Sequence, residues 1–317
     1  MDLKSMRTGY TWVLGGSGFV GFELSKQLAE SKSYSAKLVT VGHKAQNAYL
    51  MEQTNHYMRS LFDLDVSLLK RYAPEVVFHC ARMAGSHSLS RWWAARSGAK
   101  ANGLLISVLS QLAVKPVVVY CSGTLMYGEQ TGLANENSAL NPTAYAKPYL
   151  EAEMPWIKAR EQGLLDVRMA RPAWILGPSS WFERFFVRWA LTEGYVPVYG
   201  HGEQLMSVVS QADCAKQLRH CHSHGRPNND YNVYGFEPIA QEAFSKLVAQ
   251  QMGLPVKSVS RLALTKAFGK TVAEALCSNI PVNSIHHEWR QGFKPSYLHL
   301  EALIEDTVRQ LLTLRNS

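Results

Sequence analysis

The segment Gly-Gly-Ser-Gly-Phe-Val-Gly at residues 15–21 follows a short apolar run, precedes a stretch with helical periodicity and places glycines at positions 15, 18 and 21. Glycines in such a turn permit a tight bend and a close approach of the backbone to a pyrophosphate. The N–H groups that open the following helix then favour the phosphate charge. The segment therefore predicts a dinucleotide site, with an ordinary strand–helix turn as the alternative. The predicted contacts are Gly15, Ser17, Gly18, Phe19, Val20 and Gly21.

The second apolar run, at residues 37–41, ends in Gly42-His43-Lys44 and carries no acid. An acid there would bind the hydroxyls of the adenosine ribose, whereas a nearby cation accommodates a 2′-phosphate. His43 and Lys44 therefore predict NADP(H) in preference to NAD(H), unless they form an ordinary solvated basic loop.

The elements that must position these residues alternate along the chain. Four β-rich apolar runs predict buried strands at residues 10–14, 37–41, 75–81 and 116–122. Stretches of helical character separate them at residues 19–31, 46–55, 66–72 and 89–113. This alternation predicts an α/β Rossmann fold with a doubly wound parallel sheet. We place the dinucleotide-binding domain at 8–175 and a smaller substrate-binding cap at 176–317, with a segment near 205–235 returning to the sheet.

Composition narrows the class of protein. Hydrophobic residues make up 46% of the 317 residues and charged residues 18%, which predicts a large core. No apolar run approaches the ~20 residues that span a bilayer, and the first residues do not resemble a signal peptide. The five cysteines form no C-x-x-C pair, so a reducing cytoplasm is expected. The net charge of +8 comes from scattered residues, which argues against nucleic acid as a partner.

Further motifs resemble those of the extended short-chain dehydrogenases/reductases of the epimerase/dehydratase type, over nearly the whole chain. The matching segments are Asp63-Leu64, His79–Arg82, Asn102, Tyr120–Gly128, Arg171–Pro178, Gly200–Gln204 and Asp213–Ala215. The resemblance implies a nicotinamide cofactor with additional contacts from these segments. Those contacts are Asp63, Leu64, Cys80, Ala81, Arg82, Asn102, Cys121, Tyr145, Pro172, Trp174 and Ile175.

The resemblance also implies a Tyr-x-x-x-Lys pair, in which the lysine lowers the tyrosine pKa and the tyrosine transfers a proton. Tyr145 matches the tyrosine, but Tyr149 stands at the lysine position. Lys147 does not simply replace the lysine, because a residue two positions on lies about 200° around a regular helix. Pro148 either disturbs this first turn or marks the start of the helix, which would let Lys147 swing towards the ribose.

The hydroxyl that the resemblance implies on the fifth strand is also altered. Its position falls on Gly123, with Ser122 and Thr124 on either side. Neighbouring strand residues point to opposite faces, so neither inherits the role automatically. The candidate catalytic residues are Tyr145, Ser122, Thr124, Lys147 and Tyr149.

The substrate side carries apolar residues where sugar-nucleotide members of the family carry an arginine. Met206 occupies that position, which removes a bidentate phosphate ligand. A helix expected at residues 181–192 is rich in aromatic side chains, which suit a flat or apolar ligand or simply form core. The candidate substrate contacts are Met83, Thr124, Trp181, Phe185 and Met206. The histidines at 220, 222 and 224 lack carboxylate neighbours, so we expect no metal site.

These residues together predict an atypical NADPH-dependent reductase that acts on a carbonyl of an apolar or aromatic small molecule. One alternative is an epimerase or dehydratase that cycles a tightly held NAD(P). Another is a catalytically inactive NADP(H)-binding sensor or scaffold. We expect a monomer or homodimer with a small-molecule substrate and neither nucleic acid nor membrane as a partner.

Overall fold

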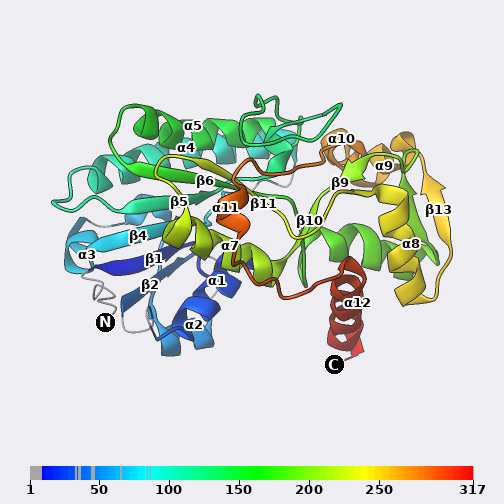
Figure 1. Ribbon diagram of the computed structural model, residues 1–317, viewed down its shortest axis with the longest axis horizontal. Helices are drawn as coiled ribbons and strands as arrows, with labels where there is room; N and C mark the ends of the chain where they lie inside the picture. Colours follow the sequence, from blue (N-terminus) through cyan, green and yellow to red (C-terminus); the bar gives the residue numbers. More distant parts are fainter. Residues whose placement is uncertain are drawn as a thin grey trace. The chain divides into compact units, whose positions relative to one another are not determined.

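The computed structural model describes residues 9–316, except 33, 35, 36, 44–46, 65, 84 and 86. Its main sheet has seven strands in the order β11-β6-β5-β4-β1-β2-β3 (Figure 1). These strands are β1 (Tyr10–Leu14), β2 (Leu38–Gly42), β3 (Asn55–Met58), β4 (Pro74–His79), β5 (Val117–Cys121), β6 (Asp166–Pro172) and β11 (Asp230–Val233). The associated helical segments are α1 (Phe19–Ala29), α2 (Ala48–Gln53), η2 (Leu61–Asp63), α3 (Val66–Arg71), α4 (Ser88–Leu109), α5 (Lys147–Glu161) and α7 (Gln211–His224).

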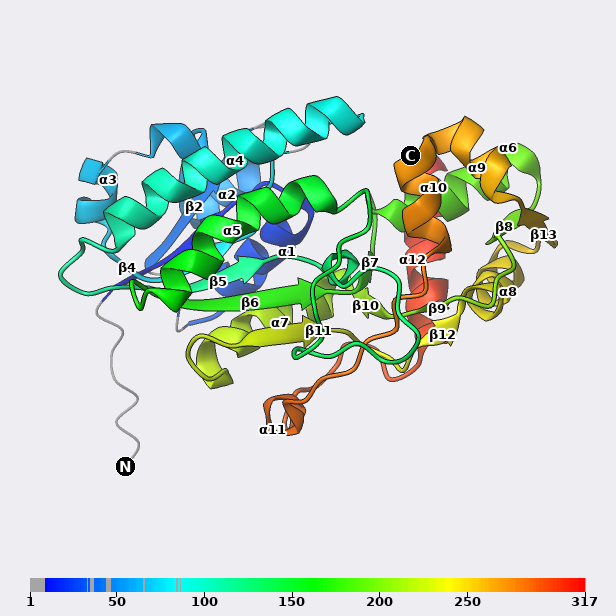
Figure 2. The ribbon, with the colours of Figure 1, turned by 90° about the horizontal axis from the view of Figure 1, so that it is seen from above.

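The sheet is the doubly wound parallel sheet that the apolar runs predict. β1 pairs in parallel with β2 and β4, and β5 continues the parallel order between β4 and β6. Helices α4 and α5 cover one face and α1 and α2 the other (Figures 1 and 2). All residues of β2 are buried, as a strand between two helical layers requires. This order brings the carboxyl ends of β1, β4 and β5 to one edge of the sheet.

The apolar runs do not predict β3, β6 or β11, and β3 departs furthest from the apolar pattern. Its sequence Asn-His-Tyr-Met has no apolar run, and its residues are half-buried or exposed. It lies at the edge of the sheet and pairs with β2 alone. Backbone hydrogen bonds along one of its two sides are therefore enough to hold it in the sheet.

The remaining elements form short two-stranded sheets and helices. The strands are β7 (Trp174–Leu176), β8 (Val196–Tyr199), β9 (Leu205–Met206), β10 (Val208–Ser210), β12 (Ile239–Ala240) and β13 (Val256–Val259). The helical segments are η3 (Thr124–Met126), η4 (Glu183–Val187), α6 (Arg188–Glu193), α8 (Gln241–Met252), α9 (Arg261–Phe268), α10 (Lys270–Cys277), α11 (His287–Arg290) and α12 (Leu300–Asn316). The aromatic helix expected at residues 181–192 is present, with a π-helical turn at η4.

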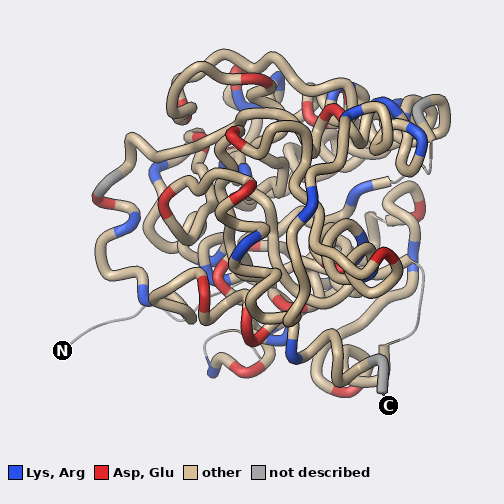
Figure 3. Tube along the Cα trace, turned by 90° about the vertical axis from the view of Figure 1, so that its right-hand side faces the viewer, with Lys and Arg blue, Asp and Glu red and all other residues tan. Residues whose placement is uncertain are grey.

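The chain divides into two compact units. Unit 1 comprises the described parts of Met1–Cys121 together with Tyr149–Ala170 and Ala215–Asp230. Unit 2 comprises Ser122–Pro148, Arg171–Cys214 and Tyr231–Ser317, of which the last residue is not described. The chain passes between the two units several times, and it first leaves unit 1 directly after β5. Lys and Arg are interspersed with Asp and Glu along the chain (Figure 3).

Candidate nucleotide site and catalytic segment

The glycine turn in unit 1 has no room for larger side chains at its first and last positions. Gly15 has φ +79°, and a Cβ there would lie 2.7 Å from the Cα of Ala81. A Cβ at Gly21 would lie 2.1 Å from the Gly15 oxygen. The N–H of Gly15 donates to the Val41 oxygen at 2.8 Å and fixes the turn to β2. The turn is therefore held as a close backbone bend between β1, β2 and α1.

The start of α1 suits a phosphate. Gly18 caps the helix without a side-chain hydrogen bond, and the first turn carries no acidic residue. Gly18 is exposed, while Ser17, Phe19 and Val20 are half-buried beside it. The N-terminal N–H groups and the helix dipole at this position favour an anion. All the predicted phosphate contacts thus lie in one turn, and the residues fit a pyrophosphate.

The end of β2 carries a glycine between two side chains. A Cβ at Gly42 would lie 2.5 Å from the Ser17 hydroxyl and 3.1 Å from Cε1 of His56. A side chain at this position would therefore require the Ser17 side chain to move. His43 follows and is exposed, while the predicted Lys44 lies outside the described residues. Asp63, at the end of η2, is exposed, and Leu64 beside it is half-buried.

The carboxyl ends of β4 and β5 carry two cysteines beside the turn. The N–H of Cys80 donates to the Leu14 oxygen at 2.9 Å, and the next residue, Ala81, packs against Gly15. The thiols of Cys80 and Cys121 hydrogen-bond to each other, and this bond, together with the charge of Arg82, lowers the pKa of Cys121 against the opposing effect of burial. Met83 follows and is half-buried.

Asn102 joins three elements of unit 1. Its Oδ1 lies 2.9 Å from Nε2 of His79, and its Nδ2 donates to the Ala152 oxygen at 2.7 Å. Burial lowers the pKa of His79 to about 4, so the ring is neutral near pH 7 and donates from Nε2 to the amide oxygen. Asn102 thus has a positioning role, in which it ties α5 to β4, and its contact with the cofactor stays a prediction.

Tyr149 and Arg82 form a contact that sequence patterns did not indicate. Tyr149 lies in the first turns of α5 and is 5% exposed. The guanidinium carbon of Arg82 lies 4.6 Å from the centroid of its ring. A cation over an aromatic face is held by the negative charge of that face. A positive charge thus stands beside the residue that replaces the lysine.

The candidate hydroxyls of the catalytic segment lie in unit 2. Nη1 of Arg171 donates to the Ser122 hydroxyl at 2.9 Å, and the Arg171 side chain is almost fully buried. Thr124 is buried and opens η3. Gly123 has φ 176°, an extended conformation open to any residue, and a Cβ there would meet only the Pro172 oxygen at 3.7 Å. The absence of a side chain at residue 123 is therefore not imposed by the backbone.

Tyr145 lies in a turn directly before α5. The Thr143 hydroxyl accepts a hydrogen bond from the N–H of Ala146 at 3.3 Å, and the Thr143 oxygen accepts one from the N–H of Lys147 at 2.8 Å. These bonds form a helical turn ahead of Pro148, which is the second residue of α5. Tyr145 is half-buried, whereas Lys147 is exposed. The structure gives no contact between the Lys147 ammonium and a described candidate residue.

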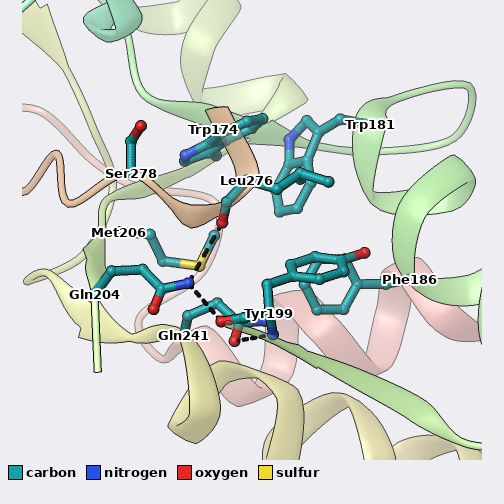
Figure 4. Close-up of a pocket in the computed structure, with 9 residues that line it drawn as sticks. All are labelled: Trp174, Trp181, Phe186, Tyr199, Gln204, Met206, Gln241, Leu276 and Ser278. Atoms are coloured by element: carbon teal, nitrogen blue, oxygen red, sulfur yellow. Dashed lines mark hydrogen bonds between the residues drawn. The ribbon is translucent and has the colours of Figure 1, made fainter. Parts of the chain in front are cut away.

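A pocket in unit 2 collects several of the predicted aromatic residues (Figure 4). The rings of Trp174 and Trp181 lie 4.7 Å apart, and Met206 lines the same space. The other lining residues are Phe186, Tyr199, Gln204, Gln241, Leu276 and Ser278. Gln204 donates to the Tyr199 and Leu276 oxygens, so its amide is already engaged by backbone.

The pocket contains two of the predicted substrate residues. Phe185 does not line it; its ring packs edge-on against Phe268 in the core, at 4.9 Å. Trp181 and Met206 do line it, as do the aromatic residues Trp174, Phe186 and Tyr199. The four non-aromatic additions are Gln204, Gln241, Leu276 and Ser278. Pro172 ends β6, and Trp174 and Ile175 form part of β7. The four additions come from separated segments, so no local motif signals them.

The sequence matches the profile of the NAD dependent epimerase/dehydratase family over residues 11–233. The chain belongs to this family. The match spans the glycine turn, the two cysteines, Tyr145 and β7, which are the parts of the epimerase/dehydratase pattern described above. No curated protein matches the chain.

Solved structures share the fold at low sequence identity. A dTDP-glucose 4,6-dehydratase, DesIV, from Streptomyces venezuelae with NAD and TYD bound has 18% identity and a TM-score of 0.75, with 97% of this chain and 98% of that chain covered. UDP-glucuronic acid 4-epimerase from Bacillus cereus, in complex with UDP-glucuronic acid and NAD, has 16% identity and a TM-score of 0.76, with 96% and 99% covered. MoeE5 in complex with UDP-glucuronic acid and NAD has 21% identity and a TM-score of 0.75, with 98% and 100% covered.

Membership of the epimerase/dehydratase family favours the alternative interpretation over the carbonyl reductase that we predicted first. Among the residues that the structure describes, no group of three metal-ligating side chains is found, and the rings of His220 and His224 stack at 4.1 Å. None of the described helices is long and apolar enough to cross a membrane.

Proposed function

We propose that the chain is an NAD(P)-dependent enzyme of the epimerase or dehydratase type, which removes a hydride from its substrate and returns it. The observation that carries the proposal is the glycine turn, in which Gly15 packs against Ala81 and α1 opens without an acidic cap. Family membership supports the reaction type, and NAD is bound in the dehydratase and epimerase structures of the same fold.

We further propose that NADP(H) is preferred. Residue 42, at the end of β2, is a glycine and offers no acid to the ribose hydroxyls. The exposed His43 follows directly and offers a polar or cationic group to a 2′-phosphate. Both features support a cofactor that carries the extra phosphate.

In the proposed reaction the bound nicotinamide supplies a hydride acceptor and donor. Tyr145 takes the proton of the substrate hydroxyl as the hydride leaves and returns it when the hydride comes back. A phenol with the ordinary pKa of about 10 needs a nearby cation to act as a base at neutral pH. The family pattern places a lysine for this purpose where Tyr149 stands here.

Within unit 1, Arg82 is the cation that we propose for the other task of this lysine, which is to hold the nucleotide. Its guanidinium lies 4.6 Å from the ring centroid of Tyr149, and its charge adds to the hydrogen bond from Cys80 in lowering the pKa of Cys121. The charge of Arg82 therefore acts at the carboxyl edge of the sheet, beside the glycine turn. Tyr149 would hold the guanidinium in place through its ring face.

The substrate that fits best carries a small apolar or aromatic group. The pocket around Trp174 and Met206 leaves about 260 Å³ between the atoms, part of it open to solvent. The closed part of this space holds about one water molecule, so an aryl group would enter it only as the lining side chains move apart. No lysine or arginine is found among the described residues that line it. The Trp181 indole N–H is buried without a hydrogen-bond partner among the described residues, which offers one donor to such a group.

The experiment tests the cofactor and the reaction separately. Tryptophan fluorescence should show saturable binding of NADPH, and mass spectrometry of the purified protein should show retained NADP. With NADP⁺ bound, one enantiomer of an aryl carbinol such as 1-phenylethanol should convert to the other without net change in absorbance at 340 nm. UDP-glucuronic acid and dTDP-glucose serve as the contrasting probes. Turnover of these two but not of aryl carbinols would contradict the substrate proposal, and net oxidation would contradict the reaction type.

Substitutions at Arg82 test the relocated charge. Arg82→Met should weaken the binding of NADPH about tenfold, because a cation beside the nucleotide is lost. Adding Tyr149→Lys to Arg82→Met should restore the affinity, because the lysine returns a positive charge to the position where the family pattern places it. An unchanged affinity in Arg82→Met would show that Arg82 does not hold the nucleotide.

A further inference from the structure

Two cysteines lie side by side at the carboxyl ends of the neighbouring strands β4 and β5. β4 and β5 pair in parallel with His79 opposite Tyr120, so the next residues, Cys80 and Cys121, follow in register. Their thiols hydrogen-bond to each other, and both residues are partly exposed. Neighbouring strands lie about 4.8 Å apart, which is within the Cα separation of roughly 4.4–6.8 Å that a disulfide requires.

The environment lowers the pKa of one of these two thiols. The hydrogen bond from Cys80 lowers the pKa of Cys121, and Arg82 adds to the effect. Burial instead raises the pKa of Cys277, and Cys214 and Cys221 are fully buried. Because the thiolate is the reactive form, Cys121 is the cysteine best placed to react with an oxidant.

We propose that Cys80 and Cys121 form a reversible redox pair that hydrogen peroxide converts to a disulfide. The Cys121 thiolate attacks one peroxide oxygen, so that an S–O bond forms, the O–O bond breaks and hydroxide leaves. The Cys80 thiol then attacks the Cys121 sulfur, so that the S–S bond forms and the S–O bond breaks. The two protons of the thiols end in water, and the peroxide is reduced to two water molecules.

The pair is mechanically linked to the glycine turn. The N–H of Cys80 bonds to the Leu14 oxygen, and a Cβ on Gly15 would lie 2.7 Å from the backbone of Ala81. A disulfide that draws Cys80 towards Cys121 therefore moves the backbone on which Gly15 rests. This consequence depends on the proposed function, and it predicts weaker nucleotide binding by the oxidised chain.

The disulfide is tested on the full chain, reduced and then treated with hydrogen peroxide. Non-reducing peptide mapping should show a Cys80–Cys121 cross-link, two thiols lost per chain, and both changes reversed by dithiothreitol. Cys80→Ser should give a sulfenic acid at Cys121 that dimedone traps. Cys121→Ser should keep its Cys80 thiol unoxidised. Cys277→Ser is the matched control and should behave as the wild type. Thiol loss without this cross-link, or no reaction at either cysteine, would overturn the proposal.

The link to the nucleotide is tested with NADPH as the probe. The oxidised chain should bind NADPH about tenfold more weakly than the reduced chain, within the usual range for coupling between two sites. Equal affinities would show that the pair does not act on the turn. Absence of NADPH binding by the reduced chain would contradict the proposed function, while the peptide map still decides the disulfide.

Discussion

Residues 15–21 and residues 122–149 belong to the same family pattern, yet only the first segment keeps the residues that the pattern requires. Gly15 and Gly21 have no space for a side chain, so the backbone itself imposes their identity. Gly123 has space for a side chain, and the ring of Tyr149 contacts the guanidinium of Arg82. Close backbone packing fixes the identity of the glycines in the nucleotide turn, whereas no such packing fixes residue 123 of the catalytic segment.

The largest effect is expected from filling the turn. Gly21→Ala would place a methyl group 2.1 Å from the Gly15 oxygen, and overpacking of this kind costs about 3 kcal/mol. Urea denaturation measures the change in the free energy of unfolding. The matched control is Gly103→Ala, because Gly103 lies within α4 and its Cβ would meet nothing within 4 Å. The control should stabilise the chain by about 0.5–1 kcal/mol; equal effects of both variants would refute the packing argument.

A second prediction concerns the scaffold that holds α5. The pKa of His79 is lowered to about 4 by burial, so the unfolded chain binds more protons than the folded chain between pH 4 and 6.5. Stability should therefore fall as the pH falls, by about 2 kcal/mol between pH 7 and 5 from this group. His79→Gln keeps a donor towards Asn102 and removes the titration. Urea unfolding at both pH values should show a correspondingly smaller decrease in this variant, and parallel decreases would contradict the assignment.

The cofactor preference gives a third, smaller effect. His43→Asp places an acid beside the expected 2′-phosphate and should raise the ratio of the NADPH to the NADH dissociation constant about tenfold. Fluorescence titration with both nucleotides measures the ratio. An unchanged ratio would mean that His43 lies away from the phosphate and belongs to a solvated loop.

The smallest effect on stability is expected at the altered hydroxyl position. Gly123→Ser should change the free energy of unfolding by less than about 0.5 kcal/mol, because its Cβ would meet only the Pro172 oxygen at 3.7 Å. Gly128→Ser is the contrasting variant, since Gly128 has φ +71° and a Cβ there would lie 1.9 Å from the Asn141 oxygen. Thermal unfolding compares the two. If both variants lost the same amount of stability, packing at residue 123 would be what excludes the hydroxyl side chain of the family pattern, contrary to our interpretation.

The sequence predicted most of unit 1, because its strands are continuous apolar runs and its glycine turn has a fixed spacing. It did not predict β3, whose edge position needs no apolar pattern. The pairing of Arg82 with Tyr149 arises between residues 67 positions apart, and only the register of β4 with its neighbours and the placement of α5 bring them together. The same holds for Cys80 and Cys121. Phe185 satisfied the aromatic pattern but packs in the core, since composition alone does not show which face of a helix meets a pocket.

The central claim is that the glycine turn binds a nicotinamide dinucleotide. Its most direct test is fluorescence titration of the wild type and Gly18→Val with NAD⁺, NADH, NADP⁺ and NADPH, with unfolding measured on both proteins. Gly18 is exposed and its Cβ would meet only the Gly15 oxygen at 3.2 Å, so the side chain would extend into the proposed phosphate position. We predict saturable binding, tightest for NADPH, by the wild type and its loss in a folded Gly18→Val. No saturation with any of the four nucleotides, or equal affinity in the folded variant, would contradict the claim.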